Sequence, residues 1–134
     1  MTSREMVPAT TEWVDAVGYS RAVRSGAHVY VAGTTALDGQ GRTIAPGDGY
    51  SQTVAILKKI EAALQELDCP LGAVVRTRVF MTDIDQWKDV GRAHREFFGD
   101  ILPASSMVEV NRLMRPDLVV EIEADALISE EARR

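Results

Sequence analysis

The sequence predicts an α+β protein whose mixed sheet carries two helices on one face. Hydrophobic periodicity gives the order strand, strand, helix, strand, helix, strand, strand. Both helices follow strands and no long run of strands occurs alone, which favours a sheet covered by helices on one side. A length of 134 residues is usual for one domain, so residues 1–134 are predicted to form a single domain with a substantial core.

The first two strands are predicted at Tyr19–Val23 and His28–Ala32. The segment between them contains Gly26 and is typical of a hairpin turn. Residues 38–49 are rich in Gly and Pro, which predicts a loop. Its glycines match neither G-x-G-x-x-G nor G-x-x-x-x-G-K-[ST], so no phosphate-binding loop is indicated.

The first helix is predicted to begin near Tyr50, because apolar residues then recur at intervals of three and four. Asp48 or Ser51 can cap its start, and Pro70 prevents its continuation. The predicted apolar face consists of Val54, Leu57, Ile60, Ala63, Leu64 and Leu67.

The third strand is predicted at Val74–Thr82, with Val75, Thr77, Val79 and Met81 on one face. Arg76 and Arg78 share the other face, where they either contact an anion or are solvated charges that discourage edge pairing.

The second helix is predicted from a cap at Asp83 or Asp85 to Gly99, just past its end. The histidine of its apolar stripe is either a pocket residue or a hydrogen-bonded, partly buried side chain. The stripe consists of Trp87, Val90, His94, Phe97 and Phe98.

The last third of the chain contains two more strands, at Pro103–Val110 and Leu118–Ala124. Side chains alternate along a strand, so Glu121, Glu123 and Asp125 share one face and apolar residues the other. Acidic residues are poor strand formers, which makes one of the three a candidate site residue. The alternative is an ordinary strand with one face in water.

Composition excludes several function classes. A net charge of −5 argues against extended contact with a nucleic-acid backbone. No apolar run reaches the ~20 residues that span a bilayer, and no leader follows Met1, so a cytoplasmic protein with no membrane partner is expected. Cys69 lies at a helix exit without an obvious activating group, and His28 and His94 are too few and too separated for a metal site.

Two helices cover only one side of the predicted sheet. Val79, Val108 and Val120 indicate apolar content on several strands that could extend to the other side. We therefore expect a homo-oligomer in which a partner subunit covers that side.

Several ordered segments resemble the reactive intermediate deaminase family, which is known as Rid or YjgF. The resemblance rests on Gly18–Ser20, Val31–Thr34, Val79–Asp83, Phe97–Phe98, Pro103–Ala104 and Val119–Ala124, and it extends over most of the chain. It implies a chorismate-mutase-like fold, a homotrimer with clefts between subunits, and no metal or organic cofactor. Deaminating members of the family hydrolyse small enamines and imines to 2-keto acids and ammonia.

The resemblance also implies the site residues. Glu121 corresponds to the glutamate thought to position water, although the sequence leaves open whether Glu121 or Glu123 faces the cleft. The substrate-binding residues implied with it are Tyr19, Gly33, Thr34, His94, Ser105 and Met107.

The chain departs from the family at Ser105, where deaminating members carry an arginine that holds the substrate carboxylate. Gly91 and His94 also replace family residues. Losing a two-bonded guanidinium fork removes roughly 3–6 kcal/mol, or about 10²–10⁴ in kcat/KM. Arg112 and Arg115 are the nearest possible substitutes in the sequence, unless they are merely solvated turn residues.

Three functions follow from these expectations. The first is a Rid-type hydrolase with an altered, polar, small-molecule substrate, in which Glu121 orients water. The second is a noncatalytic binding or regulatory trimer whose clefts hold a metabolite. Some relatives are described as ribonucleases or translation inhibitors, a function that the acidic composition makes the third choice.

Overall fold

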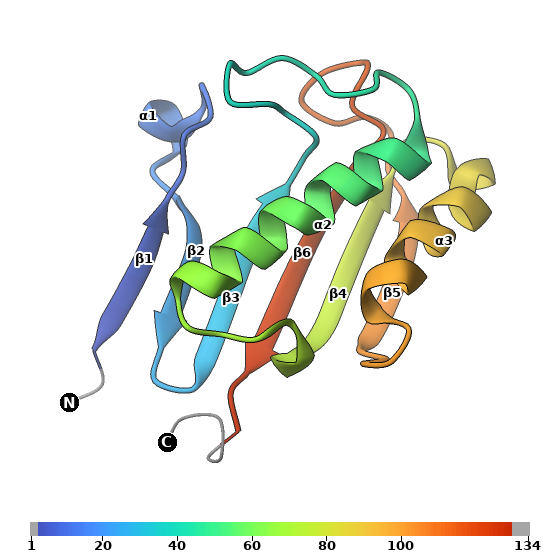
Figure 1. The fold of residues 1–134 in the computed structure, drawn as a ribbon. Coiled ribbons are helices and arrows are strands. Elements are labelled where there is room, and N and C mark those ends of the chain that lie inside the picture. The colour runs from blue at the N-terminus through green and yellow to red at the C-terminus, as the bar shows by residue number, and fades with distance from the viewer. Residues whose placement is uncertain (1–2, 130–134) are drawn as a thin grey trace.

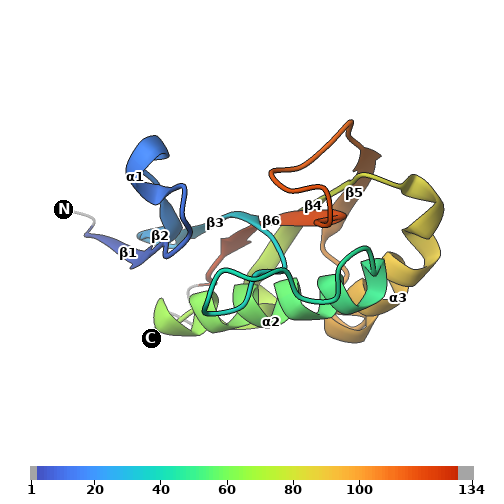
Figure 2. The ribbon, with the colours of Figure 1, turned by 90° about the horizontal axis from the view of Figure 1, so that it is seen from above.

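The computed structural model describes residues 3–129, which form one twisted sheet with two long helices packed against one of its faces (Figure 1; Figure 2). The predicted α+β class is confirmed. The strands are β1 (Arg4–Pro8), β2 (Ser20–Ser25), β3 (His28–Thr34), β4 (Val74–Met81), β5 (Ala104–Glu109) and β6 (Val120–Leu127). The helices are α1 (Val14–Val17), α2 (Gly49–Glu66) and α3 (Trp87–Phe98), with 3₁₀ turns η1 (Leu71–Ala73) and η2 (Ile84–Gln86).

The sheet order is β1-β2-β3-β6-β4-β5, so the last strand of the chain lies in the centre. β4 and β5 are parallel, and the other neighbours are antiparallel. The core lies between the sheet and α2 and α3, where Val120, Ile122 and Ala124 of β6 are fully buried. The residues that alternate with them along β6, including Glu121, therefore point to the face that the helices do not cover.

Helix α2 begins as predicted, with the Asp48 side chain accepting a hydrogen bond from the Ser51 N–H at 3.1 Å. Its buried face includes the polar residue Gln52, which has no exposed surface. The Gln52 amide donates to the Asp117 carbonyl at 2.8 Å and accepts from the Val119 N–H at 2.9 Å. This side chain therefore fixes the segment that leads into β6.

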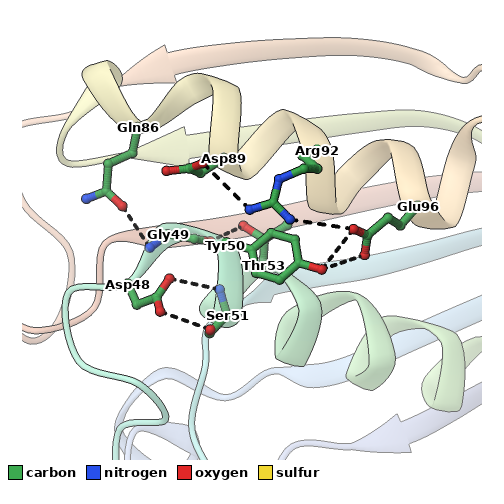
Figure 3. A network of polar contacts seen from close by, with 9 residues as sticks. All are labelled: Asp48, Gly49, Tyr50, Ser51, Thr53, Gln86, Asp89, Arg92 and Glu96. Atoms are coloured by element: carbon green, nitrogen blue, oxygen red, sulfur yellow. Dashed lines mark hydrogen bonds and ion pairs between the residues drawn. The ribbon is translucent and has the colours of Figure 1, made fainter.

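A polar network joins the N-terminal part of α2 to α3 (Figure 3). The Tyr50 hydroxyl donates to the Glu96 carboxylate at 2.8 Å, and the Arg92 guanidinium lies 3.9 Å from the centre of the Tyr50 ring. At the first residue of α2, the Gly49 N–H donates to the Gln86 side-chain oxygen at 2.8 Å. These contacts fix the packing angle of the two helices on the same face.

Four details differ from the sequence predictions. The strand β1 and the short helix α1 were not predicted, because neither has a clear periodic pattern. Val75 is 49% exposed because the pairing of β4 with β6 shifts register between Val74 and Arg76. Trp87 is 52% exposed at the first turn of α3, so it does not belong to the core stripe.

Candidate functional site

The side of the sheet away from α2 and α3 carries a pocket of about 240 Å³. Helix α1 and the segment that precedes β6 both rise on this side of the sheet (Figure 2). Glu121 of β6 and Tyr19, which precedes β2, both line the pocket. The whole lining consists of Thr11, Trp13, Val17, Tyr19, Arg21, Ala32, Gly33, Thr35, Met114 and Glu121.

Glu121 reaches the pocket because residue 33 has no side chain. A Cβ atom on Gly33 would lie 2.6 Å from Oε2 and 2.9 Å from Cδ of Glu121. Both distances are shorter than van der Waals contact, so only glycine lets the carboxylate lie against β3 at this point. The structure thus brings the predicted residues Gly33 and Glu121 into direct contact.

The three carboxylates of β6 have different partners. Arg78 of β4 contacts Asp125 at 3.1 Å and Glu123 at 3.6 Å. No ion pair among residues 3–129 includes Glu121. Arg78 therefore contacts carboxylates of the neighbouring strand β6, and Glu121 is the glutamate that lines the pocket described here.

Burial sets the protonation behaviour of Glu121. Desolvation, with a smaller effect from the nearby charge of Glu123, raises the pKa of the Glu121 carboxyl above its ordinary value, and Arg21 opposes the rise. A carboxylate with a raised pKa is a stronger base than one in water, which favours its acceptance of a proton.

Tyr19 and Arg21 form the other polar part of the pocket. The Tyr19 hydroxyl is hydrogen-bonded to the Thr11 hydroxyl, and the Arg21 guanidinium lies 5.7 Å from the centre of the Tyr19 ring. Arg21 Nη2 donates to the Gly33 carbonyl at 2.8 Å. Sequence reasoning missed Arg21, although it stands two residues after Tyr19 and so shares its face of the strand.

Other predicted site residues form a second group, on β5 and α3. Ser105 pairs with Thr77 of β4. The buried Thr77 hydroxyl donates to Ser105 Oγ at 2.8 Å and lies 2.8 Å from His94 Nε2. Met107, two residues after Ser105, is packed against the core under the helices. This group is therefore on the helix-covered face, whereas Glu121 is on the open face.

His94 combines the two roles proposed for it. It is half-buried and hydrogen-bonded, and burial lowers the pKa of its imidazole, which favours the neutral form. It also lines a groove of about 660 Å³ along α3, together with Gly91 and Phe98.

Three predicted residues have other surroundings. Thr34 is fully buried and its hydroxyl donates to the Ala32 carbonyl at 2.8 Å, whereas the neighbouring Thr35 lines the pocket. Arg115 donates to the Gly41 carbonyl at 2.6 Å and contacts Glu12 at 3.1 Å. Arg112 lines a separate hollow of about 430 Å³.

The described residues give little support for a metal site, a reactive thiol or a membrane span. Within residues 3–129, no three His, Cys, Asp or Glu side chains are grouped so that they could hold a metal ion. Burial raises the pKa of the Cys69 thiol, which disfavours the nucleophilic thiolate. No helix in this part of the chain is long and apolar enough to cross a membrane.

Comparisons with known proteins agree with this architecture. Residues 10–128 match the family described as Endoribonuclease L-PSP. A RutC family protein of Pyrococcus abyssi is 34% identical over 108 residues, covering 81% of this chain and 84% of that protein. The 2-iminobutanoate/2-iminopropanoate deaminase of Mus musculus is 31% identical over 122 residues, covering 90% of both chains.

A solved structure is similar over most of its length. The crystal structure of a Mycobacterium tuberculosis member of the YjgF/YER057c/UK114 family has a TM-score of 0.84 and 49% sequence identity, covering 94% of this chain and 100% of that one. The fold and the site define a small α+β protein with a pocket on the open face of its sheet, whose polar groups include Glu121, Tyr19 and Arg21. The chain belongs to the reactive intermediate deaminase family, also called YjgF or RutC.

Proposed function

We propose that the protein is a Rid-type hydrolase that converts a small imine or enamine to a carbonyl compound and ammonia. The observation that supports this most is Glu121, a half-buried carboxylate that forms no ion pair within residues 3–129 and lies in a pocket beside Tyr19 and against Gly33. The mouse relative named as a 2-iminobutanoate/2-iminopropanoate deaminase points to the same chemistry. We place this activity in the cytoplasm.

The proposed reaction requires little from the protein beyond positioning and proton transfer. Water adds to the imine carbon while Glu121 accepts a proton from that water. Delivery of that proton to the nitrogen gives a carbinolamine, HO–C–NH₂. A second proton then passes from its hydroxyl group through Glu121 to the nitrogen, the C–N bond breaks, ammonia leaves and the C=O bond forms. The raised pKa of Glu121 supports this double role, because the group must both accept and release a proton.

The complete site is proposed to lie between two copies of the chain. Ser105, His94 and Met107 are on or under the helix side of the sheet, whereas Glu121 is on the open side. The two groups can act on one substrate only if a second copy brings its β5 edge to the Glu121 pocket. Several apolar side chains of the strands are about half exposed and could be covered by such a copy, including Met6, Tyr30, Val75, Val108 and Leu127. We propose a homotrimer.

The first test is ammonia release from enzymatically generated 2-iminopropanoate. The unmodified protein is expected to accelerate release, and Glu121→Gln to remove the acceleration. Glu123→Gln is the matched control, because it changes the neighbouring carboxylate that contacts Arg78, and it is expected to retain activity. No acceleration by the unmodified protein across a panel of imines would contradict the proposal.

Subunit mixing tests whether two copies form the site. Glu121→Gln alters the open face and Met107→Arg alters the β5 side. If both variants are inactive alone, a refolded mixture is expected to regain activity, because some sites then combine two intact halves. A mixture as inactive as its components, or sedimentation as a 14.7 kDa monomer at micromolar concentration, would contradict a shared site.

A noncatalytic metabolite-binding trimer is the second candidate. It is favoured by Ser105, which we infer occupies the position where deaminating members hold the substrate carboxylate with arginine. Ligand binding without turnover of any imine tested would support it.

A further inference from the structure

Among residues 3–129, one cation lines the Glu121 pocket and has no part in the proposed reaction. Arg21 of β2 lines the pocket beside Tyr19 and Glu121. Its guanidinium donates from Nη2 to the Gly33 carbonyl, on the same residue against which the Glu121 carboxylate lies. Arg21 is therefore held at the place where a ligand would meet Glu121.

The opposite charge that acts on Arg21 within the pocket is that of Glu121, with which it forms no ion pair among residues 3–129. The Arg21 Nε–H is buried and has no hydrogen-bond partner within the described residues. A partly buried cation is favoured by a nearby anion, so an arginine that lines the pocket and forms no ion pair among the described residues fits an anionic ligand.

The other cations near the pocket are already engaged. Arg115 donates to the Gly41 carbonyl and contacts Glu12. Lys59 donates to the Thr35 carbonyl at 2.8 Å and to the Leu37 carbonyl at 3.3 Å, behind the pocket lining. Arg112 lines a different hollow. Arg21 is the cation that shares a pocket with Glu121.

We propose that Arg21 holds the carboxylate of a small anionic substrate in this pocket and replaces the guanidinium that is absent at Ser105. This inference rests on the proposed function for the choice of site. A planar guanidinium can hold a carboxylate through two parallel hydrogen bonds, which leaves the carbon next to it facing Glu121. The ligand class is therefore a short 2-imino or 2-keto acid, and the uncharged amide of the same shape should bind poorly.

Binding of a stable keto acid tests the inference without turnover. The probes are 2-oxobutanoate and its amide, 2-oxobutanamide, and Trp13 in the pocket wall provides a fluorescence signal. The measurements use a Trp87→Phe protein, because the chain has two tryptophans and the fluorescence of Trp87, on α3, would be added to that of Trp13. The acid is expected to bind about 10- to 100-fold more tightly than the amide, the range for hydrogen bonds to a charged group.

Variants then assign the difference to one residue. Arg21→Met is expected to weaken binding of the acid by about 10- to 100-fold and to leave the amide unchanged, with Arg21→Lys intermediate. Arg112→Gln is the matched control and should bind both probes as the Trp87→Phe protein does. If Arg21→Met does not fold, the ¹⁵Nε resonance of Arg21 in the unmodified protein is expected to shift with the acid and not with the amide.

The outcomes separate this inference from the proposed reaction. Equal binding of acid and amide, or an Arg21→Met protein that binds the acid normally, would overturn the role of Arg21 even if ammonia is released. Binding of the acid that depends on Arg21, in a protein that releases no ammonia from any imine, would support the role of Arg21 and contradict hydrolysis.

Discussion

Gly33→Ala is expected to damage the site while leaving the fold intact. The new Cβ would lie 2.6 Å from Oε2, 2.9 Å from Cδ and 3.3 Å from Cγ of Glu121. Carbon contacts are optimal at about 3.5–4.0 Å, so the carboxylate must withdraw by about 1 Å. The φ angle of Gly33 is not positive, so the alanine backbone itself is not strained. A misplacement of about 1 Å can cost 10²-fold, which is the expected loss in kcat/KM for imine hydrolysis.

A double-mutant cycle assigns that loss to the carboxylate. In a Glu121→Ala background the clash disappears, so adding Gly33→Ala is expected to change the remaining rate less than about twofold. Gly91→Ala is the matched control, because its Cβ would meet only Met107 Cε at 3.8 Å. Titration of the Glu121 carboxyl by ¹³C NMR gives a second measurement, since moving the group toward water should lower its raised pKa.

Two results would refute this reasoning. One is a Gly33→Ala protein with normal kcat/KM and a normal Glu121 titration. The other is a Gly33→Ala effect that is equally large with and without the Glu121 carboxylate, because the damage would then come from elsewhere in β3.

Three further predictions concern stability and reactivity. Burial raises the pKa of Glu121 in the folded protein, so the charged carboxylate destabilises the fold when the pH is above this raised pKa. Below the ordinary pKa of a glutamate, the carboxyl is protonated in both the folded and the unfolded protein, and the effect disappears. Glu121→Gln should therefore raise Tm at pH 7 and leave it unchanged near pH 3; a lower Tm at pH 7 would contradict this. Gln52→Leu leaves the Val119 N–H unpaired, whereas the Asp117 carbonyl keeps the hydrogen bond from the Gly47 N–H. The substitution should cost about 1–3 kcal/mol in urea unfolding, and more than Tyr50→Phe at the surface. Burial lowers the pKa of Lys59 to about 8, so its acylation rate, followed by mass spectrometry, should level off above about pH 9; a rate that rises in parallel with that of exposed Lys58 would contradict it.

The long periodic elements of the fold could be predicted from the sequence. Apolar spacing indicated α2, and alternation in β6 separated buried from open side chains. The strand β1 could not be predicted, because its pattern is short and only Val7 among its residues is buried. The register shift near Val75 could not be predicted from the sequence either, because it arises from the pairing of β4 with β6 and leaves no signal in the local residue pattern.

The site was predicted less completely than the fold, for a geometric reason. Alternation placed Glu121 and Glu123 on one face but could not distinguish them, because the distinction comes from Arg78 on the neighbouring strand. Arg112 and Arg115 are close in sequence to the last strands, yet Arg115 is held by the 38–41 turn and by Glu12.

The position of Arg21 bears on how the pocket could manage without an arginine at Ser105. An arginine at Ser105 would start from the helix-covered face of the β5 edge, so it could meet Glu121 only across a subunit boundary. Arg21 reaches the pocket from the same chain as Glu121, and both contact the backbone or Cα side of Gly33. Under our proposal, a cation and a base held by one glycine would keep a fixed separation whatever the neighbouring subunit does. Assembly would then be required to close the site and exclude water, and the charge that selects the ligand would belong to a single chain.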